Sequence, residues 1–135
     1  GWAALVADRL KLPLVYVRAK AKENGAKKRI EGDLKSGKHV VVMEDLISTA
    51  GSSVSTVQAL REEGKATVTD IVSIFSYELT TGRETAIEAN VKLHPLVTLS
   101  LLLDVALEQN KITDADADLI REFAKDPAQW SAVRA

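Results

Sequence analysis

The sequence predicts an α/β fold with a mostly parallel sheet flanked by helices on both faces. Short apolar runs rich in β-branched residues alternate with longer segments of helical periodicity, and short turns join them. Val40–Met43, a continuous apolar run, predicts a strand buried on both faces. With the segments that follow, residues 38–75 read as strand, helix and strand, one right-handed βαβ crossover. The 135 residues suffice for one domain, 1–135.

Composition narrows the function classes. Hydrophobic residues make up 46% and charged residues 27%, as in an ordinary globular protein. The net charge of −1 gives no global field toward nucleic acid or a membrane surface, so we expect neither as a partner. The absence of cysteine excludes disulfides, thiolate catalysis and cysteine-bound zinc, and it fits a reducing compartment. No apolar stretch reaches spanning length and no signal-peptide pattern opens the chain, so we expect a cytoplasmic protein.

The first elements are a helix, a strand and a basic segment. Residues 2–10 predict an amphipathic helix, and residues 14–17 predict a strand that Pro13 opens. Residues 18–29 then carry six cations and one acid, without apolar periodicity. Taken alone, this segment is as consistent with a solvated basic loop as with a binding loop. A short strand is expected at residues 30–34.

The most informative stretch follows the Val40–Met43 run. Glu44 and Asp45 come where the strand should end, and a loop of small residues, Ser48–Ser53, leads into a helical pattern. Ser52 or Ser53 is expected to cap that helix. Free N–H groups at a helix start favour a phosphate, and carboxylates accept hydrogen bonds from sugar hydroxyls. The pattern therefore predicts a ribose-phosphate site at the carboxyl end of the strand.

The second half continues the α/β alternation. The predicted helices are residues 53–63, 84–89, 99–106 and 113–126, and the predicted strands are 67–75 and 91–94. Gly64 is expected to end the first of these helices, and Pro95 to close the last strand. The apolar side of residues 99–106 is expected to belong to the core. Trp130 is expected to pack the C-terminal turn back onto the domain.

Other chemistries are less well supported. His39 and His94 lie far apart at expected strand ends and have no metal-ligand spacing, so structural or surface roles are expected, with no dedicated metal ligand. Thr49–Ser52 lacks the Gly-Lys-Ser/Thr of a nucleotide P-loop. The serines of this stretch lack the Gly-x-Ser-x-Gly frame of a nucleophile.

Two segments carry a family resemblance. Residues 40–53 resemble the phosphoribosyl-pyrophosphate (PRPP) motif of type I phosphoribosyltransferases, in the version of the orotate phosphoribosyltransferases: a hydrophobic run, two acids, two hydrophobic residues and a Ser/Thr-Thr-Gly-Gly-Ser/Thr loop. Ala50 stands where the family usually has Gly. Residues 16–25, beginning Tyr-Val-Arg, resemble the family's flexible catalytic loop, with Asn24 where the family usually has His.

The resemblance implies a type I phosphoribosyltransferase fold and a transfer of the phosphoribosyl group from PRPP to orotate in pyrimidine biosynthesis. Lys22 and Asp45 are implied as catalytic, and Ser48 as close to orotate. The implied PRPP-binding residues are Arg18, Lys22, Asn24, Glu44, Asp45, Leu46, Ile47, Ser48, Thr49, Ala50, Gly51 and Ser52. Mg²⁺ would be carried mainly by PRPP. The family also implies a homodimer whose flexible loop reaches the partner's site.

Two alternatives stay open: another type I phosphoribosyltransferase with a different acceptor base, and a non-catalytic PRPP-binding regulator. The Tyr-Val-Arg segment argues against the first alternative. Asn24 and Ala50, which depart from the family pattern, favour the second. The family's N-terminal hood over the base is expected to have no counterpart here. Tyr77, Thr81 and Arg83 would then line a base pocket from one side only.

Overall fold

The computed structural model of the chain describes residues 1–21 and 28–133. Its centre is a three-stranded parallel sheet in the order β3-β4-β5. The strands are β3 (Val42–Ile47), β4 (Asp70–Ser76) and β5 (Lys92–Thr98). A separate antiparallel ribbon pairs β1 (Tyr16–Val17) with β2 (Ile30–Glu31). The predicted α/β fold with a mostly parallel sheet is confirmed.

Six helices accompany these strands in the described part of the chain. They are α1 (Trp2–Leu10), α2 (Gly51–Glu62), α3 (Thr80–Glu88), α4 (Leu99–Glu108), α5 (Asp114–Lys125) and α6 (Pro127–Val133). Of the described helices, none has the length and apolar character needed to cross a membrane.

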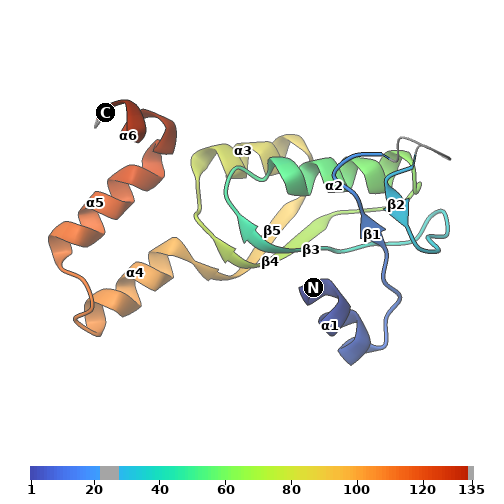
Figure 1. Ribbon diagram of the computed structural model, residues 1–135, viewed down its shortest axis with the longest axis horizontal. Helices are drawn as coiled ribbons and strands as arrows, with labels where there is room; N and C mark the ends of the chain where they lie inside the picture. The colour runs from blue at the N-terminus through green and yellow to red at the C-terminus, as the bar shows by residue number, and fades with distance from the viewer. Residues whose placement is uncertain (22–27, 134–135) are drawn as a thin grey trace.

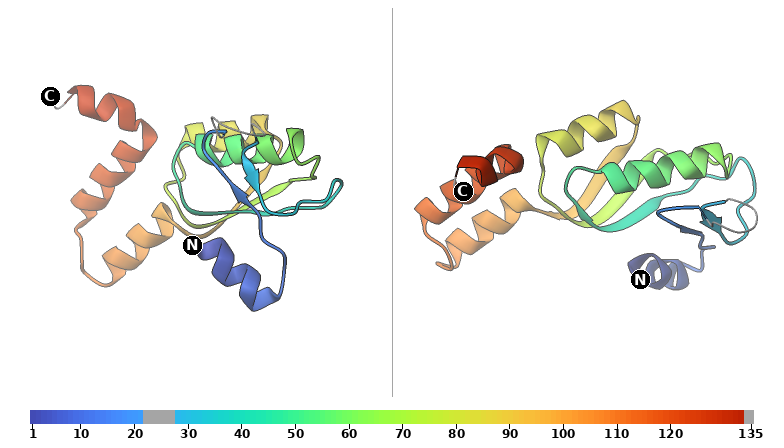
Figure 2. Two further views of the ribbon diagram at one scale, coloured as in Figure 1. Left: turned by 45° about the vertical axis from the view of Figure 1, so that its right-hand side comes forward. Right: turned by 45° about the horizontal axis from the view of Figure 1, so that its top comes forward.

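The helices cover the two faces of the sheet unequally. Figures 1 and 2 show α2 and α3 side by side on one face, while α1 lies across the other face, where it contacts β3. The strand order explains this, because two successive crossovers of the same hand that move in one direction leave their helices on the same face. Helices on both faces were predicted, and among the described helices only α1 provides the second face.

The core lies between the sheet and α2. Val57 and Ile71 are completely buried, and Leu60 and Val68 are almost so. Burying an aliphatic side chain of this size contributes about 1.5–3 kcal/mol. This packing fixes α2 against β3 and β4, and with it the loop that joins β3 to α2.

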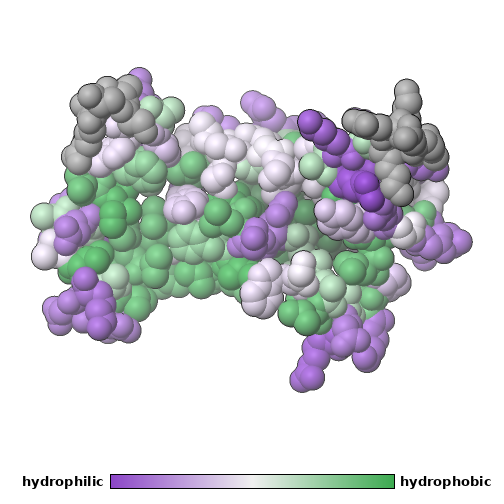
Figure 3. Space-filling model, viewed as in Figure 1, coloured by the Kyte–Doolittle hydropathy of each residue, from purple (hydrophilic) through white to green (hydrophobic). Residues whose placement is uncertain are grey.

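On the opposite face of the sheet α1 is the helix that the described residues provide, and it leaves part of that face uncovered. Figure 3 shows apolar residues gathered over the strands and α4. Large apolar side chains stay exposed at Leu96 in β5 and at Leu101, Leu102 and Val105 in α4. The side chain of Val41, just before β3, is 51% exposed. The prediction that Val40–Met43 is buried on both faces is therefore wrong, because none of the described helices covers that part of the second face.

Two strand boundaries differ from the prediction. β3 begins at Val42 and includes Glu44 and Asp45, which were expected to follow the strand. The ladder with β4 continues past the acids, since Leu46 pairs with Phe75, and pairing rather than polarity decides where the strand ends. β5 passes through Pro95 instead of closing there. An edge strand tolerates a residue without an N–H donor.

The C-terminal helices form an arm that leads away from the sheet (Figure 1). Leu99 and Leu103 anchor α4, but Leu102 on the same helix is 49% exposed, so only part of the predicted apolar side belongs to the core. Trp130 packs edge-to-face against Phe123 of α5, with ring centroids 5.8 Å apart. Trp130 therefore packs the C-terminal helix α6 onto α5.

Candidate functional site

The junction between β3 and α2 differs from its predicted form. α2 begins at Gly51, two residues earlier than expected, and its N-cap is Ala50 in a left-handed conformation with φ 61° and ψ 5°. No side chain of the described residues caps the helix. Ser52 and Ser53, the predicted caps, lie in its first turn. The reversal at Ala50 turns the chain from the strand into the helix, and the Ala50 carbonyl accepts the first helical hydrogen bond from Val54 N–H, at 2.9 Å.

Residues 48–52, here called the phosphate loop, present backbone donors to solvent. The amides of the first helical turn have no acceptor within α2, because no preceding turn exists. Ser48, Thr49, Gly51 and Ser52 are exposed, whereas the methyl group of Ala50 is buried. The positive end of the helix dipole adds to these donors. The loop thus has the geometry and the electrostatics of an anion site.

Glu44 lies under this loop on the α2 side of the sheet. Its carboxylate accepts a hydrogen bond of 3.1 Å from the hydroxyl of Ser53 in the first turn of α2. Burial raises the pKa of Glu44, and the negative charge of Asp45 adds to the rise, while the Ser53 bond opposes it. Sequence reasoning assigned Ser53 only a capping role. The available signal was its place one helical turn before Val57, on the face of α2 that is buried against the sheet.

Asp45 has a different environment from Glu44. Side chains alternate along a strand, so the two carboxylates point to opposite faces and do not converge on one atom. Asp45 is exposed and accepts a hydrogen bond of 2.8 Å from the backbone N–H of Leu46. Leu46 is 44% exposed, whereas Ile47 is buried in the core. The acidic pair therefore offers one exposed and one half-buried carboxylate.

Arg18 lies at the base of the basic segment, in the β1–β2 ribbon. Its guanidinium pairs with the carboxylate of Glu31 at 2.6 Å. Arg29 ties this ribbon to α2, because it donates to the carbonyl oxygens of Arg18 (2.8 Å) and Ser55 (3.1 Å). No hydrogen bond or ion pair between Arg18 and residues 44–52 is present in the described part of the chain. Sequence reasoning missed the anchoring role of Arg29, since a contact over 26 residues leaves no local signal.

Of the residues expected to line the base pocket, the structure brings two into one pocket. Lys22 and Asn24 lie outside the described residues. Tyr77 and Arg83 line a pocket of about 200 Å³ between α3, α4 and α5, but Thr81 does not. Glu78 lies in the same pocket, and hydrogen bonds from the hydroxyl and N–H of Ser100 lower its pKa.

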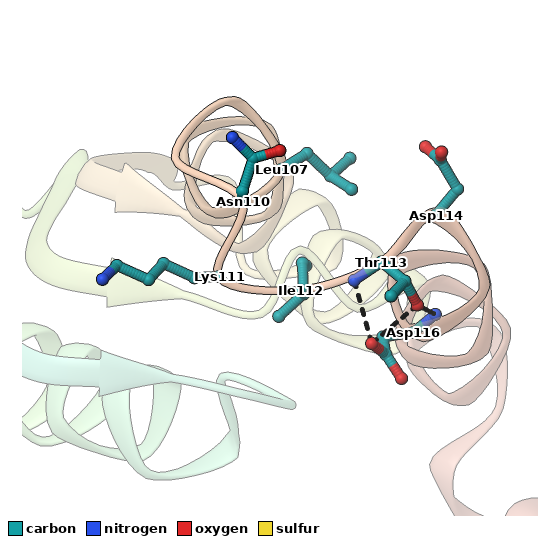
Figure 4. A pocket seen from close by; sticks show the side chains of 7 residues that line it. All are labelled: Leu107, Asn110, Lys111, Ile112, Thr113, Asp114 and Asp116. Carbon is teal, nitrogen blue, oxygen red and sulfur yellow. Dashed lines mark hydrogen bonds between the residues drawn. The ribbon is translucent and has the colours of Figure 1, made fainter.

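A larger hollow at the turn between α4 and α5 has a structural explanation (Figure 4). Two of its polar residues form a capping box: Thr113 N–H donates to the Asp116 carboxylate at 2.9 Å, and Asp116 N–H donates to the Thr113 hydroxyl at 3.2 Å. The hydrogen bonds that the Asp116 carboxylate accepts from Thr113 lower its pKa. The start of α5 was predicted from the sequence, and its cap lines one side of the hollow.

Both histidines make side-chain hydrogen bonds near the amino end of β4, away from the phosphate loop. His94 Nε2 lies 2.7 Å from a carboxylate oxygen of Asp70, and His39 Nε2 lies 3.0 Å from the hydroxyl of Thr69. Within residues 1–21 and 28–133, no group of three or more His, Cys, Asp or Glu side chains is arranged to hold a metal ion.

Comparison with solved structures defines the class of fold. The chain superimposes on UMP synthase of Leishmania donovani with a TM-score of 0.72 and 27% identity, covering 90% of this chain and 26% of that one. It superimposes on orotate phosphoribosyltransferase from Aeropyrum pernix with a TM-score of 0.63 and 31% identity, covering 76% of this chain and 55% of that one. The fold is that of the type I phosphoribosyltransferases.

Sequence relatives narrow the class. The chain is 47% identical over 128 residues to an orotate phosphoribosyltransferase of Listeria monocytogenes, covering 95% of this chain and 61% of the relative. It is 47% identical over 133 residues to one of Bacillus cereus, covering 98% and 63%. No protein-family model matches. Nearly the whole chain is thus similar to orotate phosphoribosyltransferases, and it spans about three fifths of the length of these relatives.

Proposed function

We propose that this chain carries the PRPP site of an orotate phosphoribosyltransferase, which transfers the phosphoribosyl group of PRPP to orotate and releases pyrophosphate, giving orotidine 5′-monophosphate. One observation carries the proposal: an exposed acid at the strand end adjoins a loop of unpartnered amides at a helix start, in a chain 47% identical to orotate phosphoribosyltransferases. We include one phosphoribosyltransferase domain over residues 1–135 and a cytoplasmic location in the proposal.

The phosphate loop is the proposed holder of the 5-phosphate. Backbone N–H groups at the start of α2 point outward, and three or four of them satisfy phosphate oxygens without a cationic side chain. Ser48 and Thr49 add exposed hydroxyls at the same place. In the proposal Ser48 lies toward orotate, because it is the first residue of the loop after the strand.

Asp45 is the proposed catalytic carboxylate. It is exposed, and it accepts hydrogen bonds from ribose hydroxyls while it offsets the positive charge that builds on the anomeric carbon as the bond to pyrophosphate breaks. Glu44 is held by Ser53 and reaches the ligand only from the α2 side. A Mg²⁺ ion that arrives with PRPP would find a carboxylate oxygen on Asp45, and it would supply charge neutralisation for the pyrophosphate.

Arg18 and Lys22 are the proposed cations at the leaving group, with Asn24 beside them in the same segment. A guanidinium has five donors, so Arg18 can keep its bond to Glu31 and still donate to a pyrophosphate oxygen. Each such charge contact contributes on the order of 2–4 kcal/mol to the transition state. The proposal includes a homodimer in which this segment serves the partner's site.

The decisive test is orotate-dependent pyrophosphate release, with adenine as the control acceptor. Release with adenine instead of orotate would favour another type I phosphoribosyltransferase, and PRPP binding without any release would favour a PRPP-binding regulator. Asp45→Asn should lose most of the release while PRPP still binds, because the carboxylate acts mainly on transition-state charge. Unchanged release by this variant would remove Asp45 from the mechanism.

A subunit-mixing experiment tests the shared segment. Lys22→Ala and Asp45→Asn should each be nearly inactive, and their mixture should recover part of the activity, because one subunit would supply the intact segment and the other the intact acid. The mixture is measured after labelled subunits have been shown to exchange. An inactive mixture under those conditions would show that the segment serves its own subunit.

A further inference from the structure

Gly82, in the first turn of α3, lies directly against the phosphate loop. A Cβ atom added to Gly82 would overlap the carbonyl oxygen of Ser48 and lie 3.5 Å and 3.6 Å from the carbonyl carbons of Ser48 and Thr49. These are backbone atoms, which cannot move aside as the end of a flexible side chain can. Any side chain at Gly82 therefore requires the loop or the helix to move.

The helix itself gives no reason for a glycine here. Gly82 does not have a positive φ, and a glycine inside a helix costs roughly 0.5–1 kcal/mol relative to alanine. Gly82 is also buried, so it gains nothing from exposure. What the glycine provides at this position is the close approach of α3 to the loop.

A second contact holds the same stretch of backbone. Tyr77 N–H, just after β4, donates to the carbonyl oxygen of Ile47 at 3.0 Å. The chain that enters the phosphate loop is thus bonded to the end of β4 at Ile47 and backed by α3 at Ser48. Two residues later it must adopt the left-handed conformation of Ala50, with φ 61°.

We propose that Gly82 is a positioning residue for the phosphate loop. The first turn of α3 backs Ser48 and Thr49, holds Ala50 in its left-handed conformation, and so aims the amides of Gly51 and Ser52 at a ligand phosphate. This inference rests on the proposed function in one respect, namely that the anion is the 5-phosphate of a ribose phosphate.

Gly64 offers a matched control. A Cβ atom there would also meet close neighbours, at 2.5 Å from Leu34 Cδ2, 2.7 Å from the Leu60 carbonyl oxygen and 3.0 Å from Ile30 Cδ1. Gly64 follows the far end of α2, which at 1.5 Å per residue is roughly 18 Å from the helix start. Gly64→Ala therefore imposes a comparable steric conflict away from the phosphate loop.

The experiment compares Gly82→Ala and Gly64→Ala in this chain by backbone amide NMR and by titration with ribose 5-phosphate, which presents the phosphate without pyrophosphate. Both variants should lose stability in urea. Only Gly82→Ala should shift the amide resonances of residues 48–52 before ligand is added, and only Gly82→Ala should weaken binding, by about tenfold or 1.4 kcal/mol.

Ala50→Gly provides the rescue arm. Glycine at position 50 frees the loop to move away from the new methyl group, so the double variant with Gly82→Ala should regain part of the affinity, and regain folding if the single variant does not fold. The same change in Gly64→Ala should give no such recovery. Equal affinities and unshifted loop amides in Gly82→Ala, or the absence of any rescue, would overturn the inference. If the unmodified chain binds no ribose 5-phosphate, the proposed function fails, while the loop amides and the rescue of stability still decide the role of Gly82.

Discussion

The β3–α2–β4 unit and the arm of α4, α5 and α6 both carry apolar side chains at helical or strand spacing, but they differ in how far those side chains are buried. In the unit, Val57, Leu60 and Ile71 are almost completely buried. In the arm, α4 buries Leu99 and Leu103 while Leu101 and Leu102 remain half exposed. An apolar stripe makes a helix amphipathic, but the strand order decides whether another element covers the stripe. The unit should therefore hold the phosphate loop rigidly, and the arm should contribute less to stability.

The largest expected effect is on the free energy of unfolding, when a leucine of the unit and a leucine of the arm are each replaced by alanine. Leu60→Ala, at a residue that is 2% exposed, should lower the free energy of unfolding by about 2–5 kcal/mol, because it leaves a cavity. Leu102→Ala, at a residue that is 49% exposed, should cost less than about 1 kcal/mol. Urea unfolding followed by circular dichroism measures both. An equal cost at Leu102 would mean that the arm is covered in solution, which sedimentation would reveal as self-association.

The next largest effect is expected at Ala50, in the phosphate loop of the β3–α2–β4 unit. Ala50→Val should destabilise the chain by about 1–3 kcal/mol, because a β-branched residue is poorly tolerated at φ 61° and the site is buried. Ala50→Gly should stay within about 1 kcal/mol of the unmodified chain, since relief of backbone strain and loss of a buried methyl group oppose each other. Thermal unfolding checks both changes. A harmless valine would show that the loop changes its path easily.

A smaller and local effect is expected in the arm. Thr113→Ala removes the capping box of α5 and should cost about 1 kcal/mol, whereas Thr113→Ser keeps the hydroxyl and serves as the control. Amide hydrogen exchange should show faster opening in α5 and unchanged protection in β3 and β4. Loss of protection in the strands as well would show that the arm and the sheet unfold as one unit.

The smallest effect should be a change in pH dependence. Burial raises the pKa of Glu44, so its contribution to stability is greatest below its ordinary value of 4.5 and is lost as the pH rises through the higher pKa of the folded state. Glu44→Gln removes this loss, so the variant should gain stability over the unmodified chain at pH 7 and gain less at pH 4. The exposed Glu62→Gln serves as the control. Solvent screening keeps this effect modest for a half-buried carboxylate. The same pH dependence in Glu44→Gln as in the unmodified chain would contradict this origin.

Local patterns in the sequence determined the fold class and the position of the candidate site. The β-branched run before Glu44, the small-residue loop and the apolar spacing after it were enough to predict a strand, an anion loop and a crossover helix. The family resemblance rested on the same residues, and the comparisons confirm it. The helix start at Thr113–Asp116 was likewise predicted, and the capping box that the structure shows there forms within four residues.

Only the tertiary structure decided the features that depend on distant neighbours. β3 extends through both acids because β4 continues beside it, and β5 tolerates Pro95 because it lies at the edge of the sheet. The left-handed turn at Ala50 and the contact of Gly82 with Ser48 arise where α3 returns against the loop, more than thirty residues later in the chain. Hydrogen bonds and apolar spacing within a few residues depend only on the local sequence. The space available to a side chain depends instead on the element that packs against it, which can be distant in the chain.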